Sequence, residues 1–312
     1  MMSTQLALHD AFEEAAAVSC YLNMSNLQER RHADRSTDAV LIGGKDAFAQ
    51  MPTSERSRAI AKIRAAEFAS DLREQGKCEK CALQHAYCIC ETTSSLAATV
   101  ATSGLAQRIR FVVFMHVRER KRASNTGKLL EHVLPNSEVL LHDVESDAER
   151  FRKLVAETAP GPVFVLFPSA DAVPVSQLLN SCAAKNSSLP EQSRSNSAAL
   201  AVLVDGTWRQ ARRMHKQLEN LPRVALVPRV RSEFTWRRQA TEDRICTVEA
   251  AALLLEDLEE YFVAGALRKA LGELCGALDR QSHIDTMMNG RKPIPISKKP
   301  LPAHRLPKRD VF

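Results

Sequence analysis

Short apolar runs alternate with amphipathic stretches through the middle of the chain. The runs have the length and the Val and Leu content of buried strands, and they fall at residues 108–117, 138–144, 162–167, 199–204 and 224–227. The stretches between them have helical spacing, at residues 128–134, 147–159 and 207–218. Strands separated by helices predict an α/β fold with a mostly parallel sheet and helices on both faces.

Other patterns flank this core. Further helices are predicted at residues 6–18, 54–72, 247–262 and 265–278. We expect a partly flexible helical extension, a cysteine-rich loop, the α/β domain with a polar surface insertion, and a basic proline-rich tail, at residues 1–72, 73–95, 96–280 (insertion 182–198) and 281–312.

The strand at residues 199–204 is followed directly by polar and aromatic residues. Asp205 ends the apolar run, and Gly206 and Thr207 lead into a helix that starts near Trp208. A carboxylate and an indole would then stand at the carboxyl end of a central strand, where open α/β sheets bind ligands. The same spacing is typical of an Asp that caps the helix and a Trp that fills the core.

Two more strand ends carry unusual loops. The first strand runs into a loop that ends in a tight turn, Asn125-Thr126-Gly127, and the third runs into Phe167-Pro168-Ser169. Because parallel strands end at the same edge of a sheet, these loops and the one after Asp205 can converge on one pocket. Each loop taken alone is also typical of an ordinary turn with a helix cap.

The composition limits the class of protein. The chain has 312 residues, 45% of them hydrophobic, and a net charge of +6. It lacks the apolar run of about 18 residues that a membrane span needs. The first 17 residues contain three acidic residues and no Lys or Arg, which is unlike a secretory signal. We therefore expect a cytoplasmic or nuclear protein that is not secreted.

Four of the eight cysteines cluster between positions 78 and 90. The pairs Cys78-x-x-Cys81 and Cys88-x-Cys90 can hold one tetrahedral zinc ion with four thiolates. Such a closed site is structural, because no coordination position stays open for a substrate. His85 could replace one cysteine, and four reduced thiols in a loop are the alternative.

Basic residues concentrate in three segments, one of which also carries aromatic rings. This combination suits RNA, because cations meet phosphates and rings stack on bases. The candidate contacts are Arg118, Arg120, Lys121 and Arg122 after the first strand, Arg209, Arg212 and Arg213 on the helix after Asp205, and Arg231, Trp236 and Arg238 in a later loop. The alternative for the later loop is a solvated segment whose aromatic residues anchor it to the core.

The ordered set of motifs resembles the DTW-domain family, the tRNA-uridine aminocarboxypropyltransferases. The matching segments are Cys78-x-x-Cys81 with Cys88-x-Cys90, Asn125-Thr126-Gly127, Phe167-Pro168-Ser169, Asp205-Gly206-Thr207-Trp208, Arg237-Arg238-Gln239 and Thr247-Val248-Glu249-Ala250. The resemblance implies a fold related to SPOUT-type RNA-modifying enzymes. It also implies that S-adenosylmethionine donates a 3-amino-3-carboxypropyl group to a uridine in tRNA.

The resemblance suggests roles for these residues. The donor sulfonium is already activated, so the main task is to turn its γ-carbon, rather than its methyl group, toward a uridine nitrogen. Asp205 is the candidate base for the nitrogen's proton, or it orients the donor. Trp208 could stack on adenine or uracil. The expected donor contacts are Asn125, Thr126, Gly127, Phe167, Pro168, Ser169, Asp205, Gly206, Thr207, Trp208, Arg237, Thr247 and Glu249.

Two other functions fit the same sequence. An S-adenosylmethionine-dependent RNA methyltransferase of similar fold would leave a methyl group, which is much lighter than an aminocarboxypropyl group. A zinc-stabilised RNA-binding protein without catalytic activity would neither bind the donor nor release methylthioadenosine. The intact segments at 125–127 and 205–208 count against the non-catalytic alternative.

Overall fold

The structure is a computed structural model, and it divides the chain into two compact units, residues 1–63 and 64–312. Helix α4 (Thr53–Glu74) crosses this boundary. The structure describes residues 51–105, 108–186, 198–228, 231–236 and 244–289. The predicted helix at 6–18 and the predicted site residues Arg237 and Arg238 lie outside the described residues.

Five strands form one parallel sheet in the second unit. They are β1 (Ile109–Met115), β2 (Glu138–Leu141), β3 (Val163–Leu166), β4 (Ala199–Asp205) and β5 (Arg223–Val224). Their order is β2-β1-β4-β3-β5, and every pair is parallel. β4 is the central strand, and it pairs with β1 from Ile109↔Ala199 to Met115↔Asp205. The predicted α/β class and the mostly parallel sheet are therefore confirmed.

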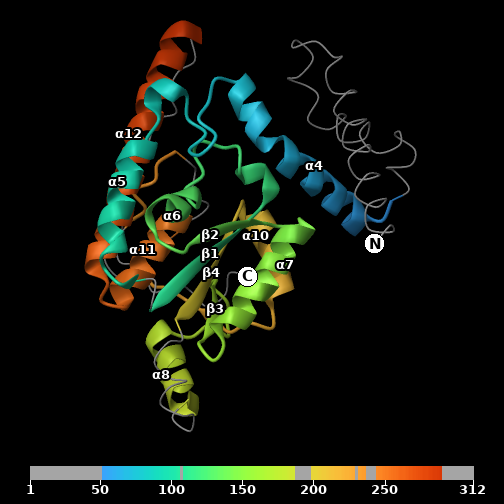
Figure 1. Cartoon of the computed structure of the whole chain (residues 1–312), viewed down its shortest axis with the longest axis vertical. Coiled ribbons are helices and arrows are strands. Elements are labelled where there is room, and N and C mark those ends of the chain that lie inside the picture. The colour runs from blue at the N-terminus through green and yellow to red at the C-terminus, as the bar shows by residue number, and fades with distance from the viewer. Residues whose placement is uncertain (1–50, 106–107, 187–197, 229–230, 237–243, 290–312) are drawn as a thin grey trace, which may run out of the picture. The chain divides into compact units, whose positions relative to one another are not determined.

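Helices cover both faces of this sheet (Figure 1). One face packs on α5 (Cys90–Ala101), α6 (Lys128–Val133), α8 (Val175–Asn186), α11 (Thr247–Asp257) and α12 (Tyr261–Asn289). The other face packs on α7 (Glu145–Thr158) and α10 (Trp208–His215). Successive side chains of β4 point to opposite faces of the sheet. Ala201 and Leu203 therefore belong to the first core, and Leu200 and Val202 to the second.

The chain leaves β1 toward one face of the sheet and leaves β4 toward the other. β1 continues into α6 on the first face, and β4 continues into α10 on the second. Since β1 and β4 are neighbours, this is the topological switch point of the sheet. A crevice opens at such a point beyond the carboxyl ends of the two strands, and open α/β sheets bind ligands there.

Three boundaries differ from the prediction. Helix α11 ends at Asp257 rather than at residue 262, because Glu259 takes a left-handed φ of 62° before α12 begins. A left-handed residue that is not glycine leaves no helix-stop signal in the sequence. The predicted insertion at 182–198 begins inside α8, and the predicted tail at 281–312 begins inside α12.

Helices α5 and α8 were missing from the prediction. α5 is rich in Ser, Thr and Ala and α8 in Ser, Asn and Ala, and both have few large apolar side chains, so their helical periodicity is weak. α5 starts at Cys90, inside the predicted cysteine-rich loop. Across the described residues, none of the helices is both long and apolar enough to span a membrane.

Candidate active site and metal centre

The three predicted loops all leave the same edge of the sheet. The loop at 116–127 follows β1, the segment at 167–172 follows β3, and Gly206 follows β4. Because β1 and β3 flank β4 on either side, the three loops surround the end of the central strand. The expected convergence along one edge is therefore present.

The carboxylate of Asp205 joins two of these segments. It is buried, with 4% of the residue exposed. Asn125 Nδ2 donates a hydrogen bond to Oδ2, and Thr247 Oγ1 donates one to Oδ1. Two residues that lie far from Asp205 in the sequence are thus held to one side chain. The structure brings together three of the predicted donor contacts at the switch point.

The turn at 125–127 is built around this carboxylate. Asn125 uses its amide group to bond Asp205 and its Oδ1 to accept from the backbone N–H of Lys128 at 3.1 Å, which caps α6. A Cβ on Gly127 would lie 3.0 Å from Cγ of Asp205 and 3.0 Å from Cγ1 of Val113. Glycine is therefore required at 127 by close packing.

The aromatic residues of the predicted site lie on the α10 face. The ring centroids of Phe167 and Trp208 are 6.4 Å apart, and Phe167 stacks on His215 at 4.0 Å. The guanidinium of Arg244 lies 3.7 Å from the Trp208 ring centroid. One face of the indole is thus taken by a cation–π contact. Stacking of Trp208 on a base through this face requires Arg244 to move.

Side chains at the start of α10 accept hydrogen bonds from the backbone N–H groups of the same turn. Thr207 Oγ1 accepts from the backbone N–H of Gln210, and Gln210 Oε1 accepts from the backbone N–H of Thr207 at 2.7 Å. This reciprocal pair is a capping box. The backbone N–H of Thr207, one of the expected donor contacts, is thus occupied by Gln210.

Glu249, on the first turn of α11, fixes a neighbouring loop. Its carboxylate is 4% exposed and accepts from the backbone N–H of Glu233 at 2.6 Å, from Ser232 Oγ at 2.6 Å and from the backbone N–H of Cys246 at 2.7 Å. Glu249 therefore attaches the segment at 231–236 to the helix. Its place in the first turn also suits the helix dipole.

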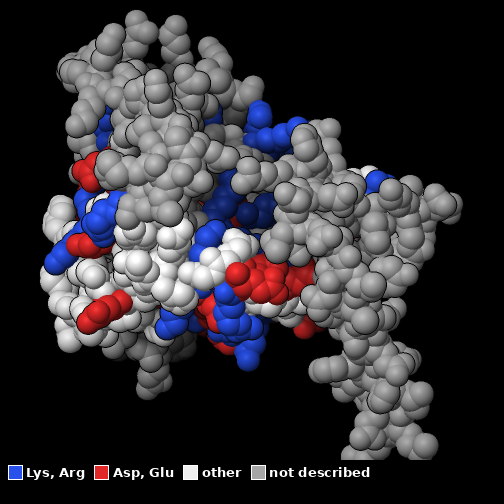
Figure 2. Space-filling model, turned by 90° about the horizontal axis from the view of Figure 1, so that it is seen from above, with Lys and Arg blue, Asp and Glu red and all other residues white. Residues whose placement is uncertain are grey.

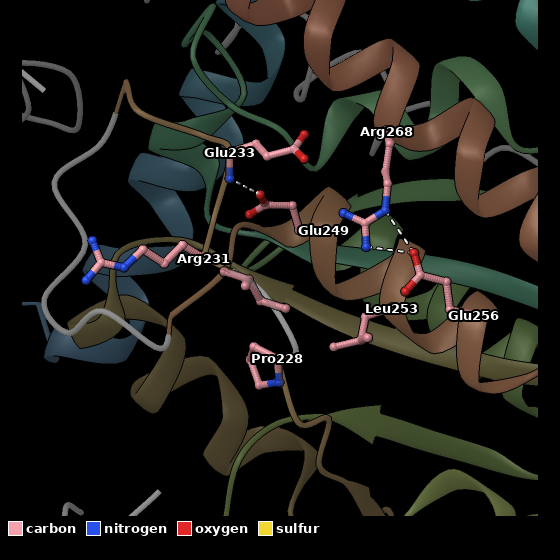
Figure 3. Close-up of a pocket in the computed structure, with 8 residues that line it drawn as sticks. Pro228, Arg231, Glu233, Glu249, Leu253, Glu256 and Arg268 are labelled. Atoms are coloured by element: carbon pink, nitrogen blue, oxygen red, sulfur yellow. Dashed lines mark hydrogen bonds and ion pairs between the residues drawn. The ribbon is translucent and has the colours of Figure 1, made fainter. Parts of the chain in front are cut away.

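A cavity of about 310 Å³ lies beside this attachment. Glu249 and Leu253 of α11 line it on one side, with Pro228 opposite (Figure 3). Arg268 donates two hydrogen bonds to Glu256 at 2.8 and 2.7 Å, so that pair of charges in the wall is mutually satisfied. Thr247, which bonds Asp205, lies two residues before Glu249 on α11 but is not among the residues that line this cavity.

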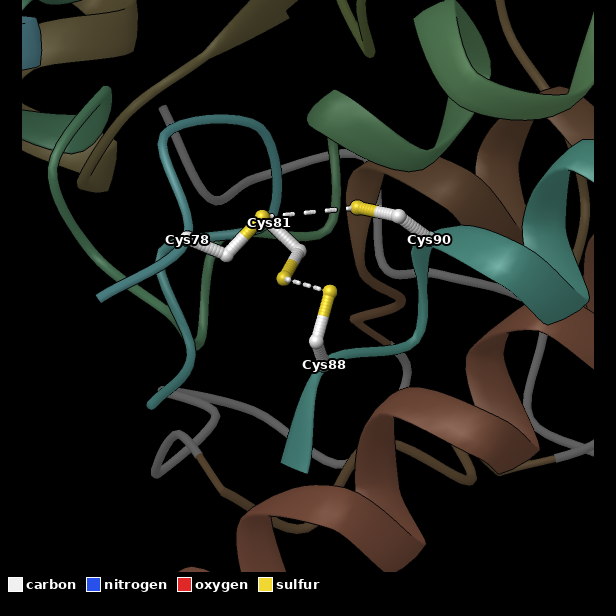
Figure 4. Close-up of side chains that lie close together, drawn as sticks. All are labelled: Cys78, Cys81, Cys88 and Cys90. Atoms are coloured by element: carbon white, nitrogen blue, oxygen red, sulfur yellow. Dashed lines mark hydrogen bonds between the residues drawn. The ribbon is translucent and has the colours of Figure 1, made fainter. Parts of the chain in front are cut away.

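The four predicted metal ligands meet in one cluster (Figure 4). Their sulfur atoms all lie within 4.8 Å of one another, with Cys78 and Cys90 at 3.6 Å and Cys81 and Cys88 at 3.8 Å. Four sulfurs around a tetrahedral zinc ion at about 2.3 Å are about 3.8 Å apart. None of these cysteines is in a disulfide. The cluster therefore fits a four-thiolate metal, and His85 is not part of it.

Ionisation of the thiols differs across the cluster. Burial opposes ionisation of Cys78, but backbone N–H groups at Cys81 and Lys80 and the neighbouring thiols outweigh it and lower its pKa to about 7. Burial raises the pKa of Cys81 to about 11 and raises that of Cys90 still more. A divalent cation would deprotonate all four thiols, and burial then strengthens its hold.

Lys128 ties this cluster to the Asn125 turn. It is 1% exposed, and its Nζ donates to the backbone carbonyls of Cys81 at 3.1 Å and Arg122 at 2.8 Å. Burial lowers the pKa of Lys128 to about 7. No sequence pattern predicts this role, since a lysine at the start of an amphipathic helix is ordinarily exposed.

The basic residues after β1 are largely held by acidic partners. Arg120 pairs with Glu131 at 2.9 Å and Arg122 with Glu119 at 3.2 Å, and Lys121 pairs with Asp71. Ion pairing leaves these three cations less available to a phosphate. The remaining residue of the group, Arg118, is exposed.

The basic face of α10 has no such partners. Arg209, Arg212 and Arg213 are exposed, and within the described part of the chain none of them forms an ion pair. Figure 2 shows one face of the molecule, on which Lys and Arg side chains gather near the middle. In the later loop, Trp236 Nε1 donates to Asp279 at 3.1 Å, which anchors this ring to α12. Arg231 is half-buried in the cavity wall.

Two functional candidates at the crevice were also missed. His116 is the first residue after β1, and its backbone N–H donates to the carbonyl of Asp205 at 2.9 Å. Gln210 Nε2 lies 3.1 Å from His116 Nδ1. The Thr207-x-x-Gln210 spacing is a recognisable capping box, so Gln210 could have been found from the sequence.

Together the fold and the site define an α/β protein with a topological switch point at its central strand and a four-cysteine cluster that fits a metal ion. The chain belongs to the DTW domain family, whose model matches residues 75–278. It is similar to curated relatives called tRNA-uridine aminocarboxypropyltransferase 2. The Drosophila melanogaster relative is 28% identical over 72% of this chain and 86% of its own length. Those of Mus musculus and Macaca fascicularis are 25% and 22% identical, over 71% and 73% of this chain and 72% and 75% of their own lengths. No solved structure is significantly similar to the chain.

Proposed function

We propose that this protein is a tRNA-uridine aminocarboxypropyltransferase. In this reaction the ring nitrogen of uridine attacks the γ-carbon of S-adenosylmethionine. The bond between that carbon and sulfur breaks, its electrons stay on sulfur, and neutral methylthioadenosine leaves while the nitrogen loses its proton. Membership of the DTW domain family carries the proposal, and the relatives named for this activity support it. The predicted relation of the fold to SPOUT enzymes remains part of the proposal.

The contacts of Asp205 favour a positioning role over proton abstraction. Both carboxylate oxygens accept hydrogen bonds from protein donors, and the residue is buried. A general base must reach the proton that it removes. We propose that Asp205 holds the Asn125 turn and the start of α11 in register, so that the donor finds a preformed edge.

We propose that the donor binds along this edge. Asn125 and Thr247 bond Asp205 on the α11 side, and Gly127 packs against its side chain, with Thr126 in the same turn. Glu249 shapes the cavity wall, because backbone N–H groups and Ser232 occupy its carboxylate. Phe167, Pro168, Ser169 and Trp208 border the same edge from the α10 side and would meet the adenosine.

We propose that tRNA docks on α10. Its exposed arginines form a short cationic strip beside the crevice, which matches the phosphate backbone of a nucleic acid. The surface would position the acceptor on the α10 side of β4, opposite the cavity on the α11 side. This arrangement places a donor and an acceptor on the two sides of one strand end.

We propose that the Cys78, Cys81, Cys88 and Cys90 cluster holds a structural zinc ion. A bound zinc would fix the turn that contains Cys81, whose carbonyl accepts from Lys128 beside the Asn125 turn. The proposed organisation is an extension at 1–72, a zinc module at 73–95, the catalytic domain at 96–280 and a basic tail after it. We place the protein in the cytoplasm or nucleus, where tRNA is available.

The function is tested by incubating the protein with unmodified tRNA transcripts and S-adenosylmethionine. We expect methylthioadenosine release and an aminocarboxypropyl-uridine in nucleoside digests, detected by mass spectrometry. A methylated nucleoside together with S-adenosylhomocysteine would instead identify a methyltransferase. Failure to bind S-adenosylmethionine in calorimetry would point to the non-catalytic RNA-binding alternative.

A further inference from the structure

His116 and Gln210 meet on the α10 side of the β1–β4 crevice. His116 follows β1 and Gln210 lies in the first turn of α10, and the proposed roles of Asp205 and its neighbours use neither residue. A Cβ on Gly206 would lie 3.1 Å from Cβ of Gln210 and 3.5 Å from Cβ of His116. The pair therefore stands directly against the turn that follows Asp205.

Hydrogen bonds fix the orientation of the Gln210 amide. Its Oε1 accepts from the backbone N–H of Thr207 at 2.7 Å and from the Thr207 hydroxyl at 2.9 Å. The oxygen must face Thr207, so the NH₂ group faces His116 and donates to Nδ1 at 3.1 Å. The capping box thus determines the orientation of the Gln210 amide, and exchanging its oxygen and nitrogen atoms would break these hydrogen bonds.

The same contacts fix the tautomer of His116. Nδ1 accepts from Gln210 Nε2 and also from the backbone N–H of Arg118 at 3.2 Å. A nitrogen that accepts two hydrogen bonds carries no proton, so the neutral ring has its proton on Nε2. Nε2 makes no hydrogen bond to any described residue, and it is not among the buried atoms that lack a partner. His116 therefore presents an accessible N–H donor beside the carboxyl ends of β1 and β4.

The ring stays neutral near physiological pH. Burial, and then the neighbouring His142 and Arg118, lower the pKa of His116 to about 4, against the opposing effect of Glu119 and Asp143. The His142 ring lies parallel to that of His116 with centroids 6.5 Å apart. A cation at His116 would meet these groups, so the site favours a neutral donor.

We infer that His116 binds the target uracil by donating its Nε2–H to one of the two carbonyl oxygens that flank the reacting ring nitrogen. This rests on the proposed function. Those oxygens are acceptors in uridine, and they take up the negative charge when the nitrogen between them loses its proton. A fixed donor there binds the base and stabilises the charge that develops during transfer. The exposed arginines of α10 approach from the same side as the acceptor.

Two substitutions separate this role from a structural one. His116→Asn keeps an oxygen near the Nδ1 position for Gln210 and Arg118 but removes the Nε2–H donor. His116→Gln carries its NH₂ group near the Nε2 position. On a transcript that the wild-type protein modifies, we expect His116→Asn to lower kcat by about 10²-fold, and His116→Gln to recover part of it. The Kd for S-adenosylmethionine, measured by calorimetry, should stay within about twofold, since His116 is not among the proposed donor contacts.

A second readout uses the substrate. Transcripts with 2-thiouridine or 4-thiouridine at the target present a sulfur, which is a weaker acceptor. We expect one of these to reduce transfer more for wild type than for His116→Asn, because the variant has no donor to lose. Unfolding temperatures of both variants control for stability. If His116→Asn folds poorly, His116→Phe takes its place in the comparison, because it keeps a ring of similar size and also has no donor.

The outcomes are distinct. Transfer by His116→Asn at the wild-type rate overturns the inference and leaves the proposed function standing. A raised Kd for S-adenosylmethionine with an unchanged thio series also overturns it, and assigns His116 to the donor. If wild type releases no methylthioadenosine on any transcript, the proposed function fails and the inference fails with it.

Discussion

At the scale of single residues, the carboxylate of Asp205 sets the geometry of the site. Its two oxygens are shared between Asn125 on one segment and Thr247 on another. Thr247→Val replaces the hydroxyl by a methyl group and leaves Oδ1 buried without this donor, at a cost of about 1–3 kcal/mol in the free energy of unfolding. Thr247→Ser keeps the hydroxyl and is the control. Urea unfolding measures both.

The same pair tests the role of Asp205. If Asp205 positions the donor site, Thr247→Val should raise the Kd for S-adenosylmethionine while Thr247→Ser does not. If Asp205 is the base, loss of a stabilising donor makes the carboxylate more basic. Transfer at saturating donor would then be kept or increased, and the positioning role would be wrong.

Gly127 offers a second test at this scale. Gly127→Ala places a Cβ 3.0 Å from the Asp205 and Val113 side chains, so the turn or the carboxylate must move. We expect lower stability and weaker donor binding, since overpacking costs about 1–3 kcal/mol. Gly272→Ala is the matched control on α12, where nothing lies within 4 Å, and it should stabilise the helix by about 1 kcal/mol. Equal thermal shifts for the two variants would contradict this packing argument.

Short sequence motifs located residues that the structure brings together. The Cys78-x-x-Cys81 spacing pointed to two members of the four-sulfur cluster, and Asp205 at a strand end is the carboxylate that joins Asn125 and Thr247. The partners of Asp205 were named as donor contacts, but their bonds to it depend on the distance between segments, which no local pattern contains. Lys128 was missed because its burial results from the packing of α6 on the cysteine cluster.

At the scale of elements, α10 carries the exposed positive charge. Arg209, Arg212 and Arg213 are free of ion pairs in the described structure, whereas the cations after β1 are paired. Arg212→Ala with Arg213→Ala should weaken tRNA binding. The slope of log Kd against log salt should fall by about 0.9 for each phosphate that the variant no longer neutralises. Binding isotherms at several salt concentrations measure both quantities.

A matched control for α10 lies on the other face of the sheet. Lys269→Ala removes an exposed cation from α12 and should leave tRNA affinity and its salt dependence unchanged. If it weakens binding as much as the α10 variants do, the effect follows net charge rather than a docking surface.

The cysteine cluster lies where several elements of the fold meet. Cys90 begins α5, and Gln84 of the same module donates its backbone N–H to the side chain of Gln281 on α12 at 3.1 Å. We expect one zinc per chain by elemental analysis. Removal with a chelator should lower the unfolding temperature and weaken donor binding through Lys128 and the Asn125 turn.

Serine replacements give the metal prediction its control. Cys88→Ser should lose zinc, while Cys182→Ser, outside the cluster, should keep it. Purified wild-type protein without zinc, or a chelated protein with unchanged stability, would exclude a structural metal.

Elements were predicted where apolar periodicity is strong, as in β1 and β4, which are almost fully buried. Elements were missed where contacts with other elements, rather than an apolar stripe of their own, hold them in place. α5 and α8 bury few large side chains of their own, so no amphipathic stripe marks them in the sequence. The break between α11 and α12 depends on one left-handed residue, Glu259, that has no glycine to mark it.

At the scale of the whole molecule, the fold holds buried histidines in their neutral form. Burial lowers the pKa of His116 and of His132 to about 4 and also lowers that of His215. Between these values and the ordinary value near 6.5, the unfolded chain binds more protons than the folded one. The contribution of these histidines to the free energy of unfolding should therefore be fully present above about pH 6.5. It should be lost as the pH drops toward 4.

The free energy of unfolding at pH 7.5 and pH 5.5, from urea titrations, tests this. Acid also releases metal from thiolates, which lowers stability in the same direction. His116→Asn separates the two causes, because asparagine does not titrate while the cysteine cluster is unchanged. The loss of stability between the two pH values should be smaller in this variant than in wild type. An equal loss in both proteins would mean that burial does not lower the pKa of His116.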